Sequence, residues 1–307
     1  MVEERMAKEE FCPLSLRDWL RVCRECEVPF VPATHVADLE TNDVKSFETK
    51  GPHQTRIEQA FKKINRAQSE GYMLRWDHCS EARIKVGMAD KEFEWREEYG
   101  DITLGDIRAF DLLFDYPYFV NPIWQRPWVQ VEIIEGFPVE YRVFVENGEL
   151  KGISNYYLQR PLPENKAHIA EITYYTDVLI HWLRKLDFVL PVRQQKEADI
   201  EKLKTLSKGK KAKREKSELD DISFAADFLV LREGYTPPFF VSHDADQIDR
   251  RVLFLEGGPP FSSGLADPCC FNPEEGISGV AWEDRSGRRS QIEEQKEWVK
   301  NLGQGEE

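Results

Sequence analysis

Charged residues stand inside apolar, strand-like segments of this chain, where they could do chemistry. Over residues 140–145, charged or polar residues alternate with β-branched and aromatic ones. This period of two predicts a β-strand with Glu140 and Arg142 on one face and Tyr141 and Val143 on the other. We therefore expect one face to present polar groups and the opposite face to pack into a core.

Two further carboxylates, Asp227 and Glu256, stand in later apolar segments that are typical of neighbouring strands. A buried carboxylate must be paired with a cation or bind a metal. Magnesium is commonly held by one or two carboxylates together with phosphate oxygens. We expect Asp227 and Glu256 to be oxygen ligands of a hard metal. The alternative is that Asp227 pairs with an arginine such as Arg232 or Arg250, while Glu256 begins a turn.

Composition limits the class of protein. The chain has 307 residues, of which 41% are hydrophobic, and this suffices for one large domain or two joined ones. The formal net charge of −14 argues against general binding to a nucleic-acid backbone. No run of 18 apolar residues and no signal-peptide pattern occur, and six cysteines do not form a disulfide framework. We expect a cytoplasmic protein.

One cysteine pair has metal-ligand spacing. Cys23 and Cys26 are separated by two residues, and Cys12 is nearby, but no second pair completes a zinc site. Trp19, Leu20 and Cys23 recur at helical spacing, which instead indicates that Cys23 faces a core.

The elements that must position these residues follow from periodicity and breakers. The sequence predicts helices from Ser15 to about Cys26 and over 54–70, 104–114, 172–186 and 291–302. It predicts strands over 72–76, 128–135, 139–145, 150–156, 223–231 and 251–255. The pair Asn147-Gly148 tolerates positive φ and predicts a hairpin turn.

A charged insertion covers 193–220 and has six basic residues within 207–216. These could contact an anionic partner such as a nucleic acid. The alternative is a solvated surface loop, which is common for segments of this composition.

The order of these features resembles the ATP-grasp superfamily. Val131-Glu-Ile-Ile-Glu-Gly, Glu140-Tyr-Arg-Val-Phe-Val and Gly152-Ile-Ser are similar to the branch that contains eukaryotic cell-division-cycle ATP-grasp proteins and small phage and bacterial families. The resemblance spans roughly residues 72–260. It implies an α+β fold in which two α+β subdomains with an antiparallel sheet clasp a nucleotide.

The resemblance also implies a division of the chain. We expect an amino-terminal helical or substrate region, a small subdomain, a large subdomain containing the insertion 193–220, and a carboxyl-terminal helix and tail. Their expected ranges are 1–71, 72–128, 129–285 and 286–307.

Matched to the family, Arg75 is the basic residue that meets ATP phosphates. Lys85 is a second candidate, although a solvated strand lysine is the more common alternative. The backbone around Gln130, Val131 and Glu132 would bind adenine. Glu132 or Glu135 would lie near the ribose.

In the same comparison, Arg142 would neutralise charge on the transferred phosphoryl group, with Glu140 orienting it. The alternative is a plain cross-strand or same-face ion pair. Asp227 and Glu256 match the magnesium ligands. The family has a further asparagine ligand where this chain has Gly258, and this glycine could simply serve a tight turn of positive φ with Gly257.

The resemblance implies an ATP- and magnesium-dependent ligase that joins a small-molecule carboxylate to an amine or thiol through an acyl phosphate, with release of ADP and phosphate. The alternative is an ATP-binding assembly chaperone with a protein partner and little turnover. A third possibility is a phosphotransferase. The substrate region would include residues 155–169, where His168 is either a proton carrier or an ordinary surface histidine.

Overall fold

The structure is a computed structural model, and it describes residues 9–46, 54–66, 72–79, 112–134, 137–156, 166–189, 222–239, 251–260 and 279–281. All statements below concern these ranges.

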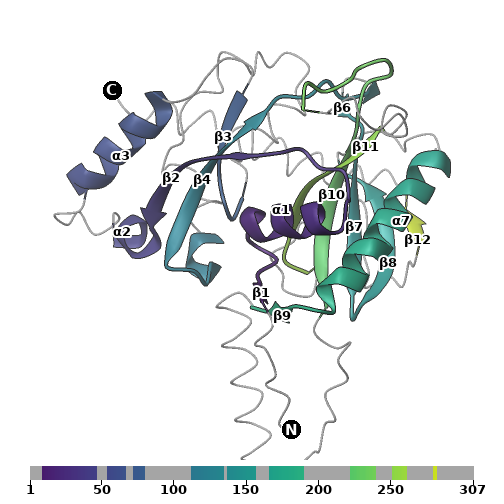
Figure 1. The fold of residues 1–307 in the computed structure, drawn as a ribbon, viewed down its shortest axis with the longest axis horizontal. Helices are drawn as coiled ribbons and strands as arrows, with labels where there is room; N and C mark the ends of the chain where they lie inside the picture. Colours follow the sequence, from purple (N-terminus) through teal and green to yellow (C-terminus); the bar gives the residue numbers. More distant parts are fainter. Residues whose placement is uncertain are drawn as a thin grey trace, which may run out of the picture.

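A five-stranded sheet forms the larger half of the described molecule (Figure 1). Its strand order is β11-β10-β7-β8-β12, with bounds Val252–Gly258, Phe224–Val230, Glu140–Glu146, Glu149–Asn155 and Gly279–Ala281. Neighbouring strands are antiparallel except for β8 and β12, which are parallel. The hairpin between β7 and β8 turns at Asn147 and Gly148, whose φ angles are 54° and 70°, so the expected turn is confirmed.

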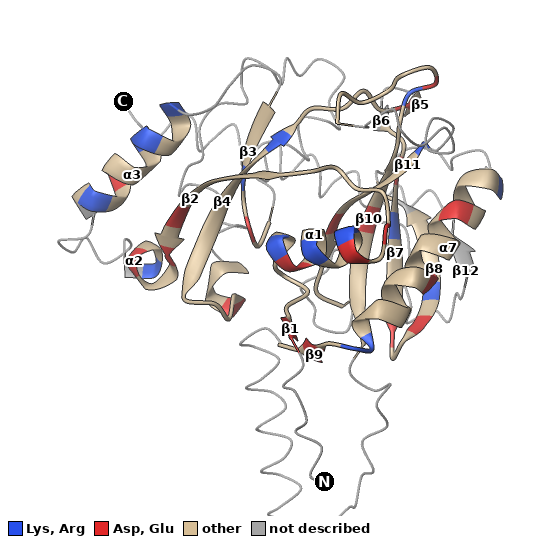
Figure 2. Ribbon diagram, viewed as in Figure 1, with Lys and Arg blue, Asp and Glu red and all other residues tan. Residues whose placement is uncertain are grey.

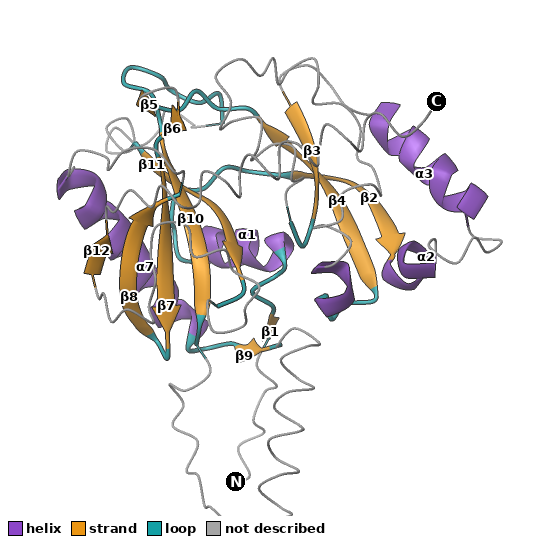
Figure 3. Ribbon diagram, turned by 180° about the vertical axis from the view of Figure 1, so that it is seen from behind, coloured by secondary structure: helices purple, strands orange, loops and turns teal. Residues whose placement is uncertain are grey.

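Two helices cover one face of this sheet, α1 (Leu16–Glu25) and α7 (Lys166–Leu183). They lie in front of the sheet in Figure 1 and behind it in Figure 3. Tyr141 and Val143 of β7 are buried in the core on this side, as the alternation predicts. Cys23 is fully buried in the same core, so its expected inward orientation is confirmed.

A three-stranded antiparallel sheet forms the smaller half, in the order β2-β4-β3. Its strands are Thr34–Glu40, Val120–Pro127 and Tyr72–Trp76. The helices α2 (Thr41–Ser46) and α3 (Gln54–Arg66) accompany it. Ile57 and Phe61 of α3 are buried in a second core with Trp76 and Ile123. The Lys and Arg residues of α3, blue in Figure 2, are exposed.

Two short strand pairs complete the described elements. The parallel pair joins β1 (Glu10–Phe11) to β9 (Asp187–Phe188), and the antiparallel pair joins β5 (Ile133–Ile134) to β6 (Phe137–Pro138).

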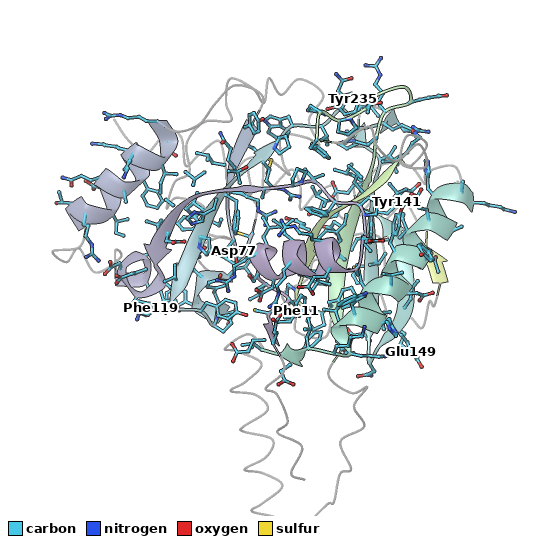
Figure 4. The ribbon with its side chains drawn as sticks, in the orientation of Figure 1. Phe11, Asp77, Phe119, Tyr141, Glu149 and Tyr235 are labelled. Carbon is cyan, nitrogen blue, oxygen red and sulfur yellow. The ribbon has the colours of Figure 1, made fainter. Side chains whose placement is uncertain are left out.

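Asp77 connects α1 to the small sheet through hydrogen bonds of its carboxylate. It follows β3 and lies between that sheet and α1 (Figure 4). Its Oδ1 accepts from the Arg17 backbone N–H at 2.9 Å and from Trp124 Nε1 at 2.6 Å, and its Oδ2 accepts from the Tyr116 hydroxyl at 2.7 Å. Burial and the Asp77 charge raise the pKa of Tyr116, so this hydroxyl remains a donor. The start of α1 is therefore fixed against both halves.

The expected strand over 128–135 is wrong. The strand in this region is β4, which ends at Pro127, and the described residues 128–134 contribute only the single bridge of Val131 to Leu231 and the short β5. Pro122 lies within β4, and a proline normally argues against a central strand, which is why the pattern was misleading. Pro122 has no N–H to donate, but its carbonyl accepts from the Asp77 N–H at 3.0 Å.

Other boundaries moved modestly. The helix α7 begins at Lys166 and ends at Leu183 instead of covering 172–186, and β11 extends to Gly258 instead of ending at residue 255. The small sheet takes β2 from the region before residue 71. The expected helix 104–114 is described only over 112–115, where it is helical. The predictions for Lys85, Glu135, 193–220 and 291–302 lie outside the described residues.

Among the described residues, no helix is long and apolar enough to cross a membrane.

Candidate functional site

A row of polar side chains crosses the large sheet. Strand register places Glu256 opposite Asp227, Asp227 opposite Arg142, and Arg142 opposite Ser154. Residues directly opposite each other share a face of the sheet, so all four lie on one side. All four are buried. This is the face opposite to α1 and α7, and the structure therefore brings together Arg142, Asp227 and Glu256, three of the charged residues that the sequence singled out.

A β-bulge in β11 places Glu256 in this row. Phe228 is opposite Phe254 and Asp227 is opposite Glu256, so Leu255 has no partner in β10. In a regular strand Phe254 and Glu256 would share a face. The extra residue turns Glu256 away from the apolar core and toward Asp227.

Arg142 and Asp227 form a bidentate ion pair. Arg142 Nε donates to Asp227 Oδ1 at 2.6 Å and Nη2 donates to Oδ2 at 2.7 Å. The guanidinium carbon also lies 4.5 Å from the centre of the Tyr156 ring. Two parallel hydrogen bonds fix the planar group, so Asp227 orients Arg142, a role that the sequence had assigned to Glu140. Glu140 is buried opposite Leu229, one register step away on the same face.

A second ion pair joins the two halves. Arg75 of β3 donates from Nη1 to Glu256 Oε2 of β11 at 2.6 Å, and its Nε donates to the Trp76 carbonyl at 3.0 Å. Both Arg75 and Glu256 are buried. The expected phosphate-binding arginine therefore lies beside the expected metal ligands, although it comes from the other sheet.

Sequence reasoning missed Arg126, which lies beside Arg75. In the small sheet Arg75 is opposite Trp124, and Arg126 follows Trp124 by two residues, so the two arginines share a face. Arg126 is 1% exposed, and its Nη2 donates to the Val31 carbonyl at 2.6 Å. Burial, reinforced by the charge of Arg75, lowers its pKa to about 9. An arginine within an aromatic, apolar segment was the available sequence signal.

The segment expected to bind adenine is largely occupied by backbone hydrogen bonds. The Gln130 carbonyl accepts from Arg232 N–H at 2.9 Å, and Glu132 N–H donates to the Val230 carbonyl at 2.8 Å. The Glu132 carbonyl accepts from Val139 N–H at 2.8 Å. The first two of these bonds flank the antiparallel bridge between Val131 and Leu231. In this geometry the N–H and C=O of Val131 point away from Leu231, toward the other side of the segment. Of the three expected residues, Val131 is the one whose backbone edge faces away from these bonds.

The Glu132 side chain pairs with Arg251, which also donates to the Leu231 carbonyl at 3.0 Å. This pair holds Glu132 at the margin of the large sheet. A ribose contact by Glu132 would require the carboxylate to leave Arg251.

An apolar cluster adjoins the polar row. Val31, Leu229, Leu231 and Leu253 are buried together, with Val129 and Val131 among the residues packed against them. Leu229 follows Asp227 by two positions in β10 and so lies on the same face, about 7 Å further along the strand. One face of the sheet therefore presents an apolar area next to paired charges.

The Asp227 and Glu256 carboxylates could hold magnesium only if a bound ligand supplied further oxygen atoms. Within the described ranges, no group of three or more His, Cys, Asp or Glu residues is arranged to hold a metal. Asp227 and Glu256 lie opposite each other and offer two carboxylates. Phosphate oxygens and water would have to complete the coordination, as is usual for magnesium.

The two glycines after Glu256 are not in a positive-φ turn, so that expectation is wrong. Both belong to β11, and neither is among the described glycines with positive φ. A Cβ on Gly257 would lie 2.0 Å from Trp19 Cε2, so this glycine is needed for the close approach of α1. A Cβ on Gly258 would meet nothing within 4 Å.

Comparisons with known proteins gave structural neighbours only. No family model matches the chain, and no curated protein matches by sequence. Cdc123 from Schizosaccharomyces pombe matches with a TM-score of 0.39 and 12% identity, covering 87% of this chain and 93% of Cdc123. A C-terminally truncated form of the same protein matches with a TM-score of 0.38 and 13% identity over the same shares.

The macrocyclase MdnC from Microcystis aeruginosa MRC, solved with its precursor peptide MdnA, matches with a TM-score of 0.29 and 13% identity. That match covers 83% of this chain and 57% of MdnC. The mixed sheets and helices confirm the expected α+β class. All three neighbours match with TM-scores below 0.5, so they do not establish a family for this chain.

Proposed function

We propose that this chain binds MgATP on the face of the large sheet that carries the polar row. The observation that supports this most strongly is the junction of two sheets, where two buried arginine–carboxylate pairs lie next to an apolar cluster. A nucleotide has the matching division into an apolar base and a polyanionic tail. Adenine would lie against the cluster near Val131, and the phosphates would lie toward Arg75 and Arg142.

Binding would proceed by exchange of ion pairs. In the described structure Arg75 holds Glu256 and Arg142 holds Asp227. MgATP brings phosphates that suit the arginines and a cation that suits the carboxylates. Each buried charge then changes its partner, and none is left unpaired, which avoids the large cost of an isolated buried charge.

The reaction that we propose is ATP-dependent ligation. A substrate carboxylate oxygen attacks the γ-phosphorus, the bond from that phosphorus to the β–γ bridging oxygen breaks, and ADP leaves. An amine or thiol then attacks the acyl carbon and loses its proton to solvent. The bond from this carbon to the oxygen that bridges it to phosphorus breaks, and phosphate leaves with that oxygen. Arg142 would stabilise charge on the transferred group, while Asp227 and Glu256 would hold magnesium, which supplies charge neutralisation when bound.

Calorimetric titration of MgATP tests the binding step. We expect saturable, magnesium-dependent binding by the wild type and at least tenfold weaker binding by Asp227→Asn and Glu256→Gln, because each loses a carboxylate from the metal position. Glu149→Gln is the matched control, since Glu149 is an exposed carboxylate of the same sheet that pairs with Lys151. Folding of each variant is checked by circular dichroism. Wild-type affinity in both site variants, or no binding by folded wild type, would reject the site.

A second function is favoured by the small number of oxygen ligands. Two carboxylates and Gly258, where the family has asparagine, would suit a protein that binds MgATP with little turnover and presents a surface to a protein partner. ADP release measured with panels of small acids and amines separates the possibilities. Ligated product supports the ligase, a phosphorylated product without ligation supports a phosphotransferase, and tight binding without product supports the assembly role.

A further inference from the structure

Arg126 is a buried cation with few partners. Its side chain is 1% exposed, and within the described part of the chain neither Nε nor Nη1 has a hydrogen-bond partner. These two nitrogens carry most of the N–H groups of the guanidinium. Buried polar groups in proteins are nearly always hydrogen-bonded, and leaving a buried charge unpaired is costly. An arginine in this state therefore indicates a ligand that supplies acceptors.

The charges around Arg126 do not balance. The described groups that act on it electrostatically are Arg75, Glu256 and Cys23. Burial raises the pKa of the Cys23 thiol well above its usual range, so Cys23 is neutral. Glu256 is hydrogen-bonded to Arg75 at 2.6 Å and is the one carboxylate in this set. Two guanidinium groups thus share one carboxylate, while Arg142 is already neutralised by Asp227.

The arrangement of the two arginines selects the kind of anion. Arg75 and Arg126 are diagonal neighbours on β3 and β4, with Cα atoms about 7–8 Å apart, and both side chains project from the same face. The Val31 carbonyl fixes the Arg126 guanidinium through Nη2 at 2.6 Å. Two planar forks held at this separation suit an anion with several oxygens and more than one charge, for which arginine is the preferred partner.

We propose that Arg126 and Arg75 form a buried receptor for a phosphate group at the junction of the two sheets. The group is either inorganic phosphate or a phosphoryl group of a nucleotide, and the inference rests on the proposed function only for the second source. The phosphate accepts from the free N–H groups of Arg126 and from Arg75, and it offsets the excess positive charge.

Thermal unfolding in EDTA at constant ionic strength tests the receptor, with orthophosphate, tripolyphosphate and ATP as separate probes and chloride as the reference. We expect the melting temperature of the wild type to rise saturably with at least one phosphate probe. Arg126→Met should weaken that apparent affinity at least tenfold. Without phosphate the same variant should melt no lower than wild type, because it removes an unpaired buried charge. A purely structural arginine would instead lower the melting temperature when replaced.

The matched control is Arg21→Met, which removes an arginine of α1 that pairs with Glu9 and lies far more exposed. If Arg126→Met does not fold, Arg126→Lys takes its place, since it keeps a long basic side chain but loses the planar fork, and it should weaken phosphate binding. An unchanged response in the folded Arg126 variant, or no phosphate response in wild type, overturns the proposal.

The two proposals fail separately. Phosphate binding that depends on Arg126 without any MgATP binding would overturn the proposed function and leave the receptor, with free phosphate as its ligand. If Arg126→Met still binds MgATP and responds to phosphate as the wild type does, the receptor is overturned and the proposed function stands. An ATP response lost in Arg126→Met identifies the nucleotide as the source.

Discussion

Arginine, rather than lysine, occupies all three buried cationic positions of the site, Arg75, Arg126 and Arg142. Burial disfavours the charged form of a basic group, and lysine starts about two pKa units below arginine. Even Arg126, whose pKa burial lowers to about 9, stays charged at neutral pH. A lysine in the same place would be close to neutral and could not hold an oxyanion.

His168 provides a pH test at the residue scale. It was expected at the surface or as a proton carrier, but it is buried on α7, where the groups that act on it are Arg251 and Glu132, with the Tyr141 ring nearby. Burial first, and Arg251 second, lower its pKa below the usual 6.5, while Glu132 opposes this. The unfolded chain therefore binds the proton more readily.

Stability from this histidine is complete above pH 6.5 and is lost as pH falls below that value toward the folded pKa. We expect His168→Gln to reduce the loss of unfolding free energy between pH 7.5 and 5.5, by about 1.4 kcal/mol per unit of pKa shift at most. Urea unfolding at the two pH values measures this. Equal losses in variant and wild type would contradict the assignment.

At the scale of elements, β11 has two local features that a regular strand would lack. The bulge at Leu255 turns Glu256 toward the polar row, and Gly257 then lets α1 approach the sheet closely. The Trp19 ring packs edge-on to Phe224, with centroids 5.0 Å apart, and against Phe254 at 5.3 Å. One short segment thus sets both the site on one face and the helix packing on the other.

Gly257→Ala tests this packing. The added methyl group would overlap Trp19, so we expect a loss of about 1–3 kcal/mol in unfolding free energy, the usual cost of overpacking a core. Gly258→Ala is the matched control, because its Cβ would enter open space, and we expect a change within about 0.5 kcal/mol. Urea denaturation compares the two. Equal destabilisation would mean that the strand's backbone, and not Trp19, sets the requirement.

At the scale of the whole molecule, the two sheets are joined by polar groups as well as by chain connections. Arg75 reaches Glu256, and Arg126 reaches the Val31 carbonyl. Phe30 also forms a single parallel bridge with Phe254. Because the proposed phosphate positions are these same arginines, ligand binding and the coupling of the two halves should depend on each other.

Hydrogen exchange tests the coupling. Glu256→Gln leaves Arg75 without its carboxylate. In the ligand-free protein we therefore expect the backbone amides of β3 and β11 to exchange faster, with their protection free energy reduced by at most about 3 kcal/mol. Exchange in β8 should be unchanged. Glu149→Gln, which alters an exposed pair on β8, should leave β3 and β11 as in wild type. Uniform acceleration across all strands would indicate global destabilisation instead of loosening at the junction.

The sequence by itself determined the elements with a clear period and the faces that they present. Alternation along 140–145 placed Arg142 on one face of the strand and Tyr141 and Val143 on the other. Helical spacing placed Cys23 in the core, and Asn147-Gly148 specified the hairpin turn. These features depend on neighbours a few residues apart, so local steric and hydrophobic rules suffice to predict them.

Only the tertiary structure decided the partners of the buried charges. Arg142 binds Asp227 and Arg75 binds Glu256 through contacts between residues distant in sequence. The same holds for the burial of Arg126, most of whose N–H groups have no acceptor among the described residues. The bulge at Leu255 and the proline-containing β4 gave no periodic pattern to detect. Register and pairing are set by packing over the whole fold, because each buried charge takes whichever partner the assembled sheets bring within reach.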